Sequence, residues 1–92
     1  MNKRELVDSI ADRLDVDVPK HAVESVIDSF TQVVGESLRA GEKVTLTGFG
    51  TFEPRKRDAR TARNPQTGES VKVPARTVPA FKAGQKLKDT VA

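Results

Sequence analysis

An α+β fold with a projecting β-ribbon is predicted because the spacing of the apolar residues changes along the chain. Residues 1–41 carry apolar stripes at helical spacing, and the pattern then alternates as it does in strands. Residues 53–79 contain almost no large apolar side chain, and a short helical pattern returns at 82–92. The length fits a single domain, residues 1–92, in which these segments form a helical region, a β-ribbon arm and a C-terminal helix.

Two helices account for the helical region. Asn2 with Glu5 three positions later has the form of an N-terminal capping pair for the first helix. The second helix is expected to begin near Asp17, a good N-cap, with Pro19 in its first turn, and to end at Gly41. One face of this long helix is apolar and is formed by Val23, Val26, Ile27, Phe30, Val34 and Leu38.

Strands and turns are predicted for the segments that follow. KVTLT at 43–47 alternates apolar and polar residues, as a strand does. In GFGTF at 48–52 the two glycines favour a tight bend with Phe49 packed inward. NPQTG at 64–68 combines a proline that fixes φ with a glycine that frees it, which is typical of a turn. We therefore expect residues 53–79 to form two antiparallel strands folded about this turn.

The apolar residues are too few to give one copy of the chain a sufficient core. The run PRKRDARTAR at 54–63 offers no face that could pack on the body, and without the ribbon the body has about seventy residues, near the limit for one core. In the C-terminal helix, Leu87 and Val91 are expected to face inward. Further apolar residues that need partners are Phe49, Phe52 and Phe81. A homodimer that shares its core, with residues 1–41 as the dimerisation region, is the predicted solution.

Charge is divided unevenly along a chain whose net charge is +3. Residues 1–42 contain five basic and nine acidic residues, whereas residues 43–92 contain eleven basic and four acidic residues. This asymmetry predicts a polyanion-binding surface in one part of the fold, with ordinary solvated charge as the alternative. The chain has no cysteine, no signal-peptide pattern and no apolar stretch that could span a bilayer, so a cytoplasmic location is expected.

Most of the basic residues of the second half lie in the ribbon. They are Arg55, Lys56, Arg57, Arg60 and Arg63 on the outgoing strand, and Lys72 and Arg76 on the return. Arginine side chains bind phosphates in a forked geometry and also fit a narrow minor groove of DNA. A disordered basic loop is the alternative, and the orderly turn and strand patterns argue against it.

Pro65 follows the arginines directly and has two interpretations. Locally, it could do no more than nucleate the turn at 64–68. Alternatively, it is an apolar wedge at the tip of a basic ribbon, since minor-groove architectural proteins insert such side chains between base pairs and kink the duplex.

A second basic patch is a candidate on the body of the protein. Its residues are Lys82, Lys86 and Lys88 near the C-terminal helix, together with Lys3 at the start of the chain. Surface lysines that merely extend into solvent are an equally good interpretation.

No pattern in the sequence indicates an enzyme, a metal site or a cofactor. The single histidine, His21, has no cysteine to pair with and is expected to be a solvated helix residue. GFGTF lacks the lysine and the strand–helix setting of a phosphate-binding loop. Asp8, Asp12 and Asp15 share a helix face, for which solvation is a better explanation than metal binding.

Four segments together resemble the HU/IHF family of histone-like DNA-bending proteins. They are MNK-EL at the start, GFGTF at 48–52, ARTARNPQTGE at 59–69 and VPAFKAGQKLKD at 78–89. The resemblance covers essentially the whole chain, and it implies an intertwined homodimer with an α-helical base, a small antiparallel sheet and two β-ribbon arms. It also implies that the arms hold double-stranded DNA in the minor groove, and that the protein bends DNA largely without regard to sequence and organises the bacterial chromosome in the nucleoid.

The resemblance assigns DNA contacts to particular residues of this chain. In the arm they are Arg55, Arg57, Arg60, Arg63, Asn64, Pro65 and Lys72, with Pro65 as the intercalating residue, and Arg76 adds a cation beside them. On the body they are Lys3, Lys82, and Lys86 or Lys88. Three positions depart from the family pattern. Pro54 replaces a common valine and is expected to bend or loosen the root of the arm, Asp58 places an acid in the basic run, and Gln85 replaces a frequent lysine.

The NPQTG turn favours the HU type over the site-specific IHF type, without excluding the latter. Two functions from other classes are alternatives to DNA binding. An RNA-binding module would need aromatic stacking platforms, and the arm contains no aromatic residue. A ribbon that adds to the sheet of another protein would need neutral strand-forming residues where this one has cations. A preference for nicked or distorted DNA stays open.

Overall fold

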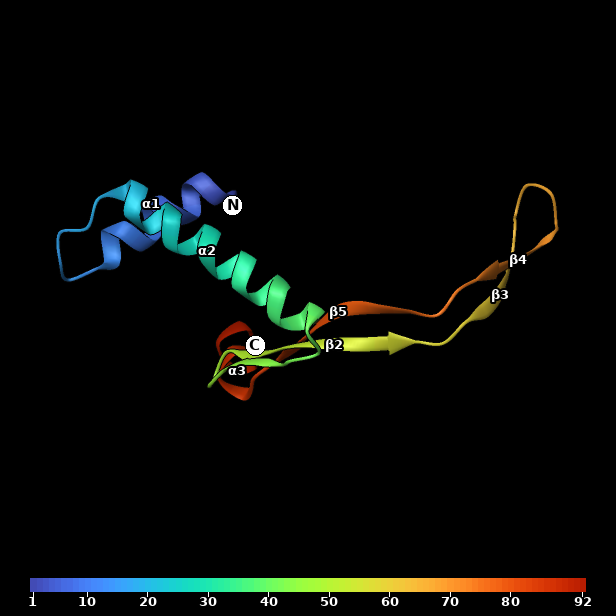
Figure 1. The fold of residues 1–92 in the computed structure, drawn as a ribbon. Coiled ribbons are helices and arrows are strands. Elements are labelled where there is room, and N and C mark those ends of the chain that lie inside the picture. Colours follow the sequence, from blue (N-terminus) through green and yellow to red (C-terminus); the bar gives the residue numbers. More distant parts are fainter. The chain divides into compact units, whose positions relative to one another are not determined.

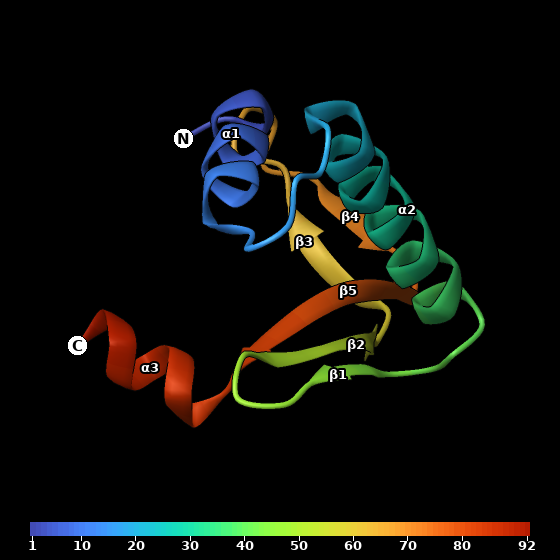
Figure 2. The same ribbon diagram turned by 90° about the vertical axis from the view of Figure 1, so that its left-hand side faces the viewer.

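The computed structural model describes residues 1–92, which form two compact units, Met1–Glu36 and Ser37–Ala92. The α+β class predicted from the sequence is confirmed. Along the chain the elements are α1 (Lys3–Arg13), α2 (Lys20–Arg39), β1 (Val44–Leu46), β2 (Gly50–Arg57), β3 (Arg60–Arg63), β4 (Ser70–Val73), β5 (Arg76–Ala83) and α3 (Gln85–Val91), as labelled in Figures 1 and 2.

Helix α2 begins at Lys20, so the prediction that Asp17 is its N-cap is wrong. The carbonyl of Pro19 accepts hydrogen bonds from the backbone N–H groups of Ala22 and Val23, at 3.0 and 3.3 Å, and the helix starts directly after this proline. A residue that precedes proline is driven out of the helical region of φ/ψ space, so the residue before Pro19 cannot belong to the helix. Asp17 therefore lies too far upstream to cap it.

The predicted start of the first helix and the predicted end of the second helix are confirmed. The side chain of Asn2 accepts a hydrogen bond from the backbone N–H of Glu5 at 2.9 Å, as an N-cap does. After α2, the N–H of Gly41 bonds to the carbonyl of Leu38 at 3.0 Å, and the N–H of the following residue bonds to the carbonyl of Ser37 at 2.9 Å. These two bonds form a Schellman motif, which satisfies carbonyls that the end of the helix leaves open.

In the first unit, α1 lies beside the first turns of α2 (Figures 1 and 2). Val7 of α1 and Val23 and Val34 of α2 are the only buried hydrophobic residues of the whole chain. Among the other members of the apolar stripe, Val26 is 68% exposed and Phe30 is 39% exposed, whereas Ile27 and Leu38 are half-buried. Val33, which lies outside the predicted stripe, is also 56% exposed. One copy of the chain thus buries only part of the apolar face of α2.

In the second unit, β1, β2 and β5 form an antiparallel sheet in the order β1-β2-β5, and α3 follows β5 (Figure 2). The register pairs Phe52 with Val44 on one side and with Phe81 on the other. Paired residues share a face, and successive residues alternate between faces. One face of the sheet is therefore apolar, whereas the other carries Thr45, Thr51 and the polar residues in register with them.

The GFGTF segment forms the tight bend that its glycines predict. The N–H of Phe49 bonds to the carbonyl of Leu46 at 2.9 Å, and Gly48 has a φ of +84°, a backbone conformation that favours glycine. The carbonyls of this bend also accept bonds from Gly84 at 2.7 Å and from Leu87 at 3.1 Å, which join it to the start of α3. The ring of Phe49 lies 5.5 Å from that of Phe81 but is 46% exposed, so it packs inward only in part.

The ribbon contains two ladders where two continuous strands were expected. The stem ladder pairs β2 with β5, and the tip ladder pairs β3 with β4. Between them, residues 58–59 and 74–75 are unpaired, opposite one another. The predicted turn at 64–68 is confirmed as the connection at the tip.

Pro54 does not interrupt the stem ladder, so the expectation that it loosens the root of the arm is wrong. It pairs directly with Pro79, and the ladder continues on both sides of this pair. Antiparallel pairs alternate between hydrogen-bonded and non-hydrogen-bonded kinds, and two prolines fit only the second kind because neither has an N–H to donate.

The C-terminal helix is shorter than predicted. Strand β5 extends to Ala83 and α3 covers Gln85–Val91, so residues 82 and 83 belong to the strand. Leu87 is half-buried as expected, but Val91 is 79% exposed, and the inward orientation predicted for it is wrong in a single copy of the chain.

Candidate nucleic-acid interface

Four of the predicted contact residues share one face of the stem ladder. Arg55 and Arg57 lie two residues apart on β2, and the register places Arg76 opposite Arg57. Lys82 pairs with Thr51, which lies on the same face of β2. The stem thus presents a cationic face opposite its apolar face, while Lys56 lies on the apolar side.

Glu53 holds one of these cations in place. Its carboxylate Oε1 accepts a hydrogen bond from Arg55 Nη2 at 3.1 Å, and its Oε2 lies 3.7 Å from Lys43 Nζ. The hydrogen bond from Arg55, together with the positive charge of Lys43, holds the pKa of Glu53 below its usual value. The sequence-based interpretation missed this role of Glu53, although Glu53 and Arg55 are two apart on a strand and so share a face.

The tip ladder separates two arginines that the sequence had grouped. Arg63 and Lys72 lie on one face of this ladder, because Lys72 pairs with Thr61, two residues before Arg63. Arg60 pairs with Val73 and lies on the other face, which otherwise carries Ala62 and the apolar residues of β4.

Asn64 shapes the turn at the tip through both its backbone and its side chain. Its Oδ1 accepts a hydrogen bond from the N–H of Gln66 at 2.9 Å, and its carbonyl accepts one from Gly68 at 2.7 Å. Gly68 has a φ of +74°, as such a turn requires. Pro65 is exposed within this turn. Asn64 therefore positions Pro65, and the side-chain oxygen of Asn64 already accepts a hydrogen bond within the protein.

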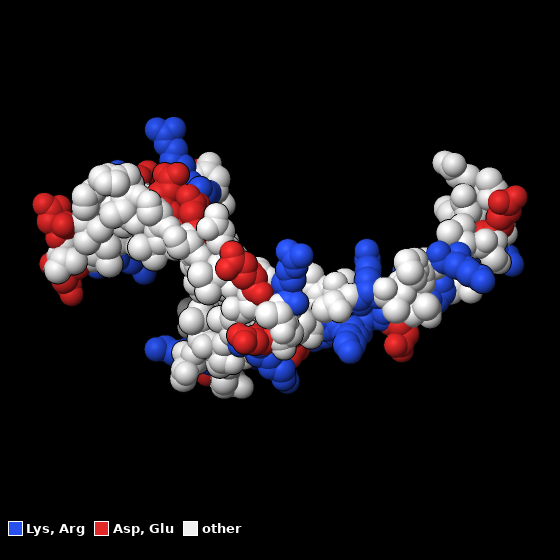
Figure 3. Space-filling model, viewed as in Figure 1, with Lys and Arg blue, Asp and Glu red and all other residues white.

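Most cations of the ribbon have no anionic partner. No carboxylate lies within 4.0 Å of Arg57, Arg60, Arg63, Lys72 or Arg76. Figure 3 shows Lys and Arg side chains projecting at intervals along the ribbon, and only few acidic ones among them. These charges are available to an external anion.

The body residues are less uniform. Lys3 Nζ lies 2.6 Å from Asp28 and 3.6 Å from Glu24, and the hydrogen bond to Asp28 raises the pKa of the lysine. In α3, Lys86 and Lys88 are two residues apart, which is a rotation of about 200° around the helix axis, so their side chains project to nearly opposite sides. The side chain of Lys86 passes over the GFGTF bend. Lys86 and Lys88 therefore lie on different sides of α3.

Asp8 is paired with Lys20 at 3.1 Å, and no group of three or more His, Cys, Asp or Glu residues could hold a metal ion. None of the helices has both the length and the apolar character needed to cross a membrane.

Comparison with known proteins places this geometry in a family. Residues 1–92 match the family described as "Bacterial DNA-binding protein". The chain is 50% identical over 91 residues to DNA-binding protein HU-beta of Serratia marcescens, covering 99% of each chain. It is 51% identical over 90 residues to DNA-binding protein HU of Lactococcus lactis subsp. lactis, covering 98% of this chain and 97% of that protein.

Solved structures give the same result. The fold matches Anabaena HU in a cocrystal with DNA with a TM-score of 0.91 and 44% identity, over 100% of this chain and 98% of that one. It matches HU from Thermotoga maritima with a TM-score of 0.67 and 30% identity, over the full length of both chains. On sequence and fold together, this chain belongs to the bacterial DNA-binding protein family.

Proposed function

We propose that this chain is a histone-like protein that binds double-stranded DNA largely without regard to sequence, bends it, and helps to compact and organise the bacterial chromosome in the nucleoid. It acts by binding and not as an enzyme. The observation that carries the proposal is the ribbon, in which every arginine except Arg55 lacks a carboxylate partner and whose stem presents one cationic face. The full-length similarity to HU proteins, one of them crystallised with DNA, supports it.

The arms act in the minor groove. Arg55, Arg57, Arg60, Arg63, Lys72 and Arg76 supply phosphate and groove contacts that fix the position of the protein but do not read sequence. Lys82, Lys86 and Lys88 supply further contacts along the body, and Lys3, whose charge Asp28 and Glu24 already offset, supplies a weaker one. Pro65, held at the tip by Asn64, enters between two base pairs and opens that step, and the resulting bend brings more phosphates to the cations.

The active form is a homodimer with two arms. The partly exposed apolar stripe of α2 and the half-exposed rings of the sheet support this assembly, because a second copy would cover surfaces that one copy does not bury. Two arms also allow the dimer to hold the duplex at two points and bend it between them.

An electrophoretic titration of linear, nicked and cruciform duplexes at two salt concentrations tests the proposal. We expect all three to bind, with an affinity that falls steeply with salt and varies little between unrelated linear sequences. Competition with single-stranded RNA separates DNA binding from the alternative of an RNA-binding module. Stronger competition by RNA than by duplex DNA, or binding that salt does not weaken, would contradict the proposal.

A further inference from the structure

The junction between the two ladders of the ribbon contains a hollow of about 590 Å³, within the size range of small-ligand sites. We call it the joint hollow. It lies where residues 58–59 and 74–75 leave the pairing, between the end of the stem ladder and the start of the tip ladder. Its lining residues are Arg57, Asp58, Ala59, Arg60, Val73, Pro74, Arg76, Val78 and Pro79.

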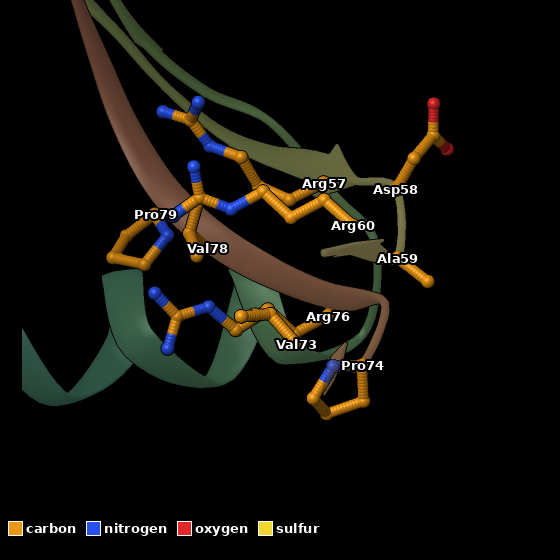
Figure 4. Close-up of a pocket in the computed structure, with 9 residues that line it drawn as sticks. All are labelled: Arg57, Asp58, Ala59, Arg60, Val73, Pro74, Arg76, Val78 and Pro79. Carbon is orange, nitrogen blue, oxygen red and sulfur yellow. The ribbon is translucent and has the colours of Figure 1, made fainter. Parts of the chain in front are cut away.

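Three arginines meet at the joint hollow because the ladder is interrupted there. Arg57 and Arg76 form the last pair of the stem, so they share a face. Arg60 is three residues beyond Arg57, and in an uninterrupted strand it would point to the opposite face. The unpaired residues 58–59 remove this constraint, and Figure 4 shows the side chains of all three arginines extending to the same side of the ribbon.

The positive charge of the joint hollow is not compensated within the protein. None of the three arginines has a carboxylate within 4.0 Å, and the side chain of Asp58 points away from them (Figure 4). Charges of like sign held close together repel one another, and an anion that binds between them removes this repulsion. Val78 and Pro79 add an apolar surface beside the guanidinium groups.

We propose that the joint hollow binds one sugar–phosphate unit and that this binding fixes the tip ladder on the stem. The phosphate lies among the guanidinium groups, which offer it forked hydrogen bonds, and the sugar lies against the apolar surface. Arg57 and Arg76 come from the stem whereas Arg60 comes from the tip, so a phosphate held by all three joins the two ladders. The inference rests on the proposed function, since DNA is the obvious source of such units. A free sugar phosphate has the same chemistry.

Titration with 2-deoxyribose 5-phosphate at constant ionic strength, followed by amide NMR, tests this site without DNA. We expect saturable shifts confined to residues 57–60 and 73–79, and none with 2-deoxyribose. Arg76→Gln should weaken binding about tenfold or more, because each hydrogen bond to a charged group contributes about 1.5–3 kcal/mol. Arg60→Gln, on the other ladder, should have the same effect. Lys56→Gln, which removes a charge from the other face of the stem, is the matched control and should leave binding unchanged.

Shifts spread evenly over all cations of the ribbon, or equal affinity in Arg76→Gln and the parent, would overturn the inference. Circular dichroism checks that each variant is folded. The joining of the ladders is read from 15N relaxation at the tip, which should show less motion when the ligand is bound. If the motion of the tip does not change when the ligand binds, the proposal that the ligand joins the two ladders is wrong.

A salt titration with linear duplex identifies the source of the phosphate. If DNA supplies it, the slope of log K against log salt falls by about 0.9 per arm in Arg76→Gln and much less in Lys56→Gln. If the sugar phosphate binds but the slope is unchanged, the ligand is a free sugar phosphate. If the protein binds duplex but does not respond to the sugar phosphate, only the proposal that the joint hollow is a binding site is refuted. If the parent protein fails to bind duplex, the proposed function is refuted.

Discussion

The helical unit and the ribbon use their charged residues in opposite ways. In the helical unit Lys3 and Lys20 are paired with carboxylates, at 2.6 Å from Asp28 and 3.1 Å from Asp8. In the ribbon only Arg55 has such a partner. Exposed ion pairs contribute little to stability, but they lower the charge that a surface presents to a ligand. The difference indicates that the helices serve folding and assembly whereas the ribbon serves binding.

The largest expected effect is on stability, from a change in the helical unit. Phe30→Ala, in the middle of the apolar stripe of α2, should lower the free energy of unfolding by about 3–5 kcal/mol if the homodimer buries this ring. Thermal midpoints measured over a hundredfold range of concentration, together with sedimentation, check it. If the thermal midpoint of the parent protein does not change with dilution and the mass is that of a monomer, the prediction that two copies share a core is wrong.

The next effect separates bending from binding within the ribbon. Pro65→Ala should keep the fold, the dimer and much of the affinity for nicked DNA, but lose the bending of intact duplex, because opening a base step costs a few kcal/mol that the wedge must supply. Energy transfer across a short end-labelled duplex measures the bend. A folded variant that bends linear DNA as strongly as the parent would leave Pro65 as a turn residue only.

A smaller effect concerns the one ribbon arginine that is paired. Glu53→Gln should release Arg55 and Lys43, and so tighten duplex binding and steepen its salt dependence. The pKa of Glu53 is lowered, so its ion pairs stabilise the fold above the ordinary value of 4.5 and are lost only as the pH falls through the lowered value. The parent and the variant should therefore differ from pH 8 to pH 5 and converge only at more acid pH. Convergence already at pH 6 would contradict this.

Local signals predicted much of the fold. The cap at Asn2, the end of α2 at Gly41 and the turn at 64–68 all depend on contacts within a few residues, and those contacts are visible in the sequence. The start of α2 was placed wrongly because the N-cap preference of Asp17 was given more weight than the restriction that Pro19 imposes on the residue before it. The exposure of Val91 could not be predicted, since it depends on which surfaces one copy of the chain buries.

The composition of the sequence predicted which segment forms the candidate site, but it did not predict on which face of the ribbon each cation lies. Counting cations identified the ribbon, yet the count grouped Arg60 with Arg63, and the register places them on opposite faces of the tip ladder. The interruption at residues 58–59 decides where Arg60 points. It depends on pairing with residues 74–75, which are distant in sequence, so no local pattern reveals it. The pairing of Arg55 with Glu53 could have been predicted from their spacing on a strand.

The most direct test of the difference between paired and unpaired cations compares Arg57→Gln with Lys3→Gln. Each variant removes one positive charge, but Arg57 has no carboxylate partner and Lys3 has two. The quantity measured is the slope of log K against log salt for one linear duplex, with folding checked by circular dichroism. We predict that the slope falls by about 0.9 per arm for Arg57→Gln and by clearly less for Lys3→Gln. Equal falls, or a larger fall for Lys3→Gln, would contradict the assignment of DNA binding to the unpaired cations of the ribbon.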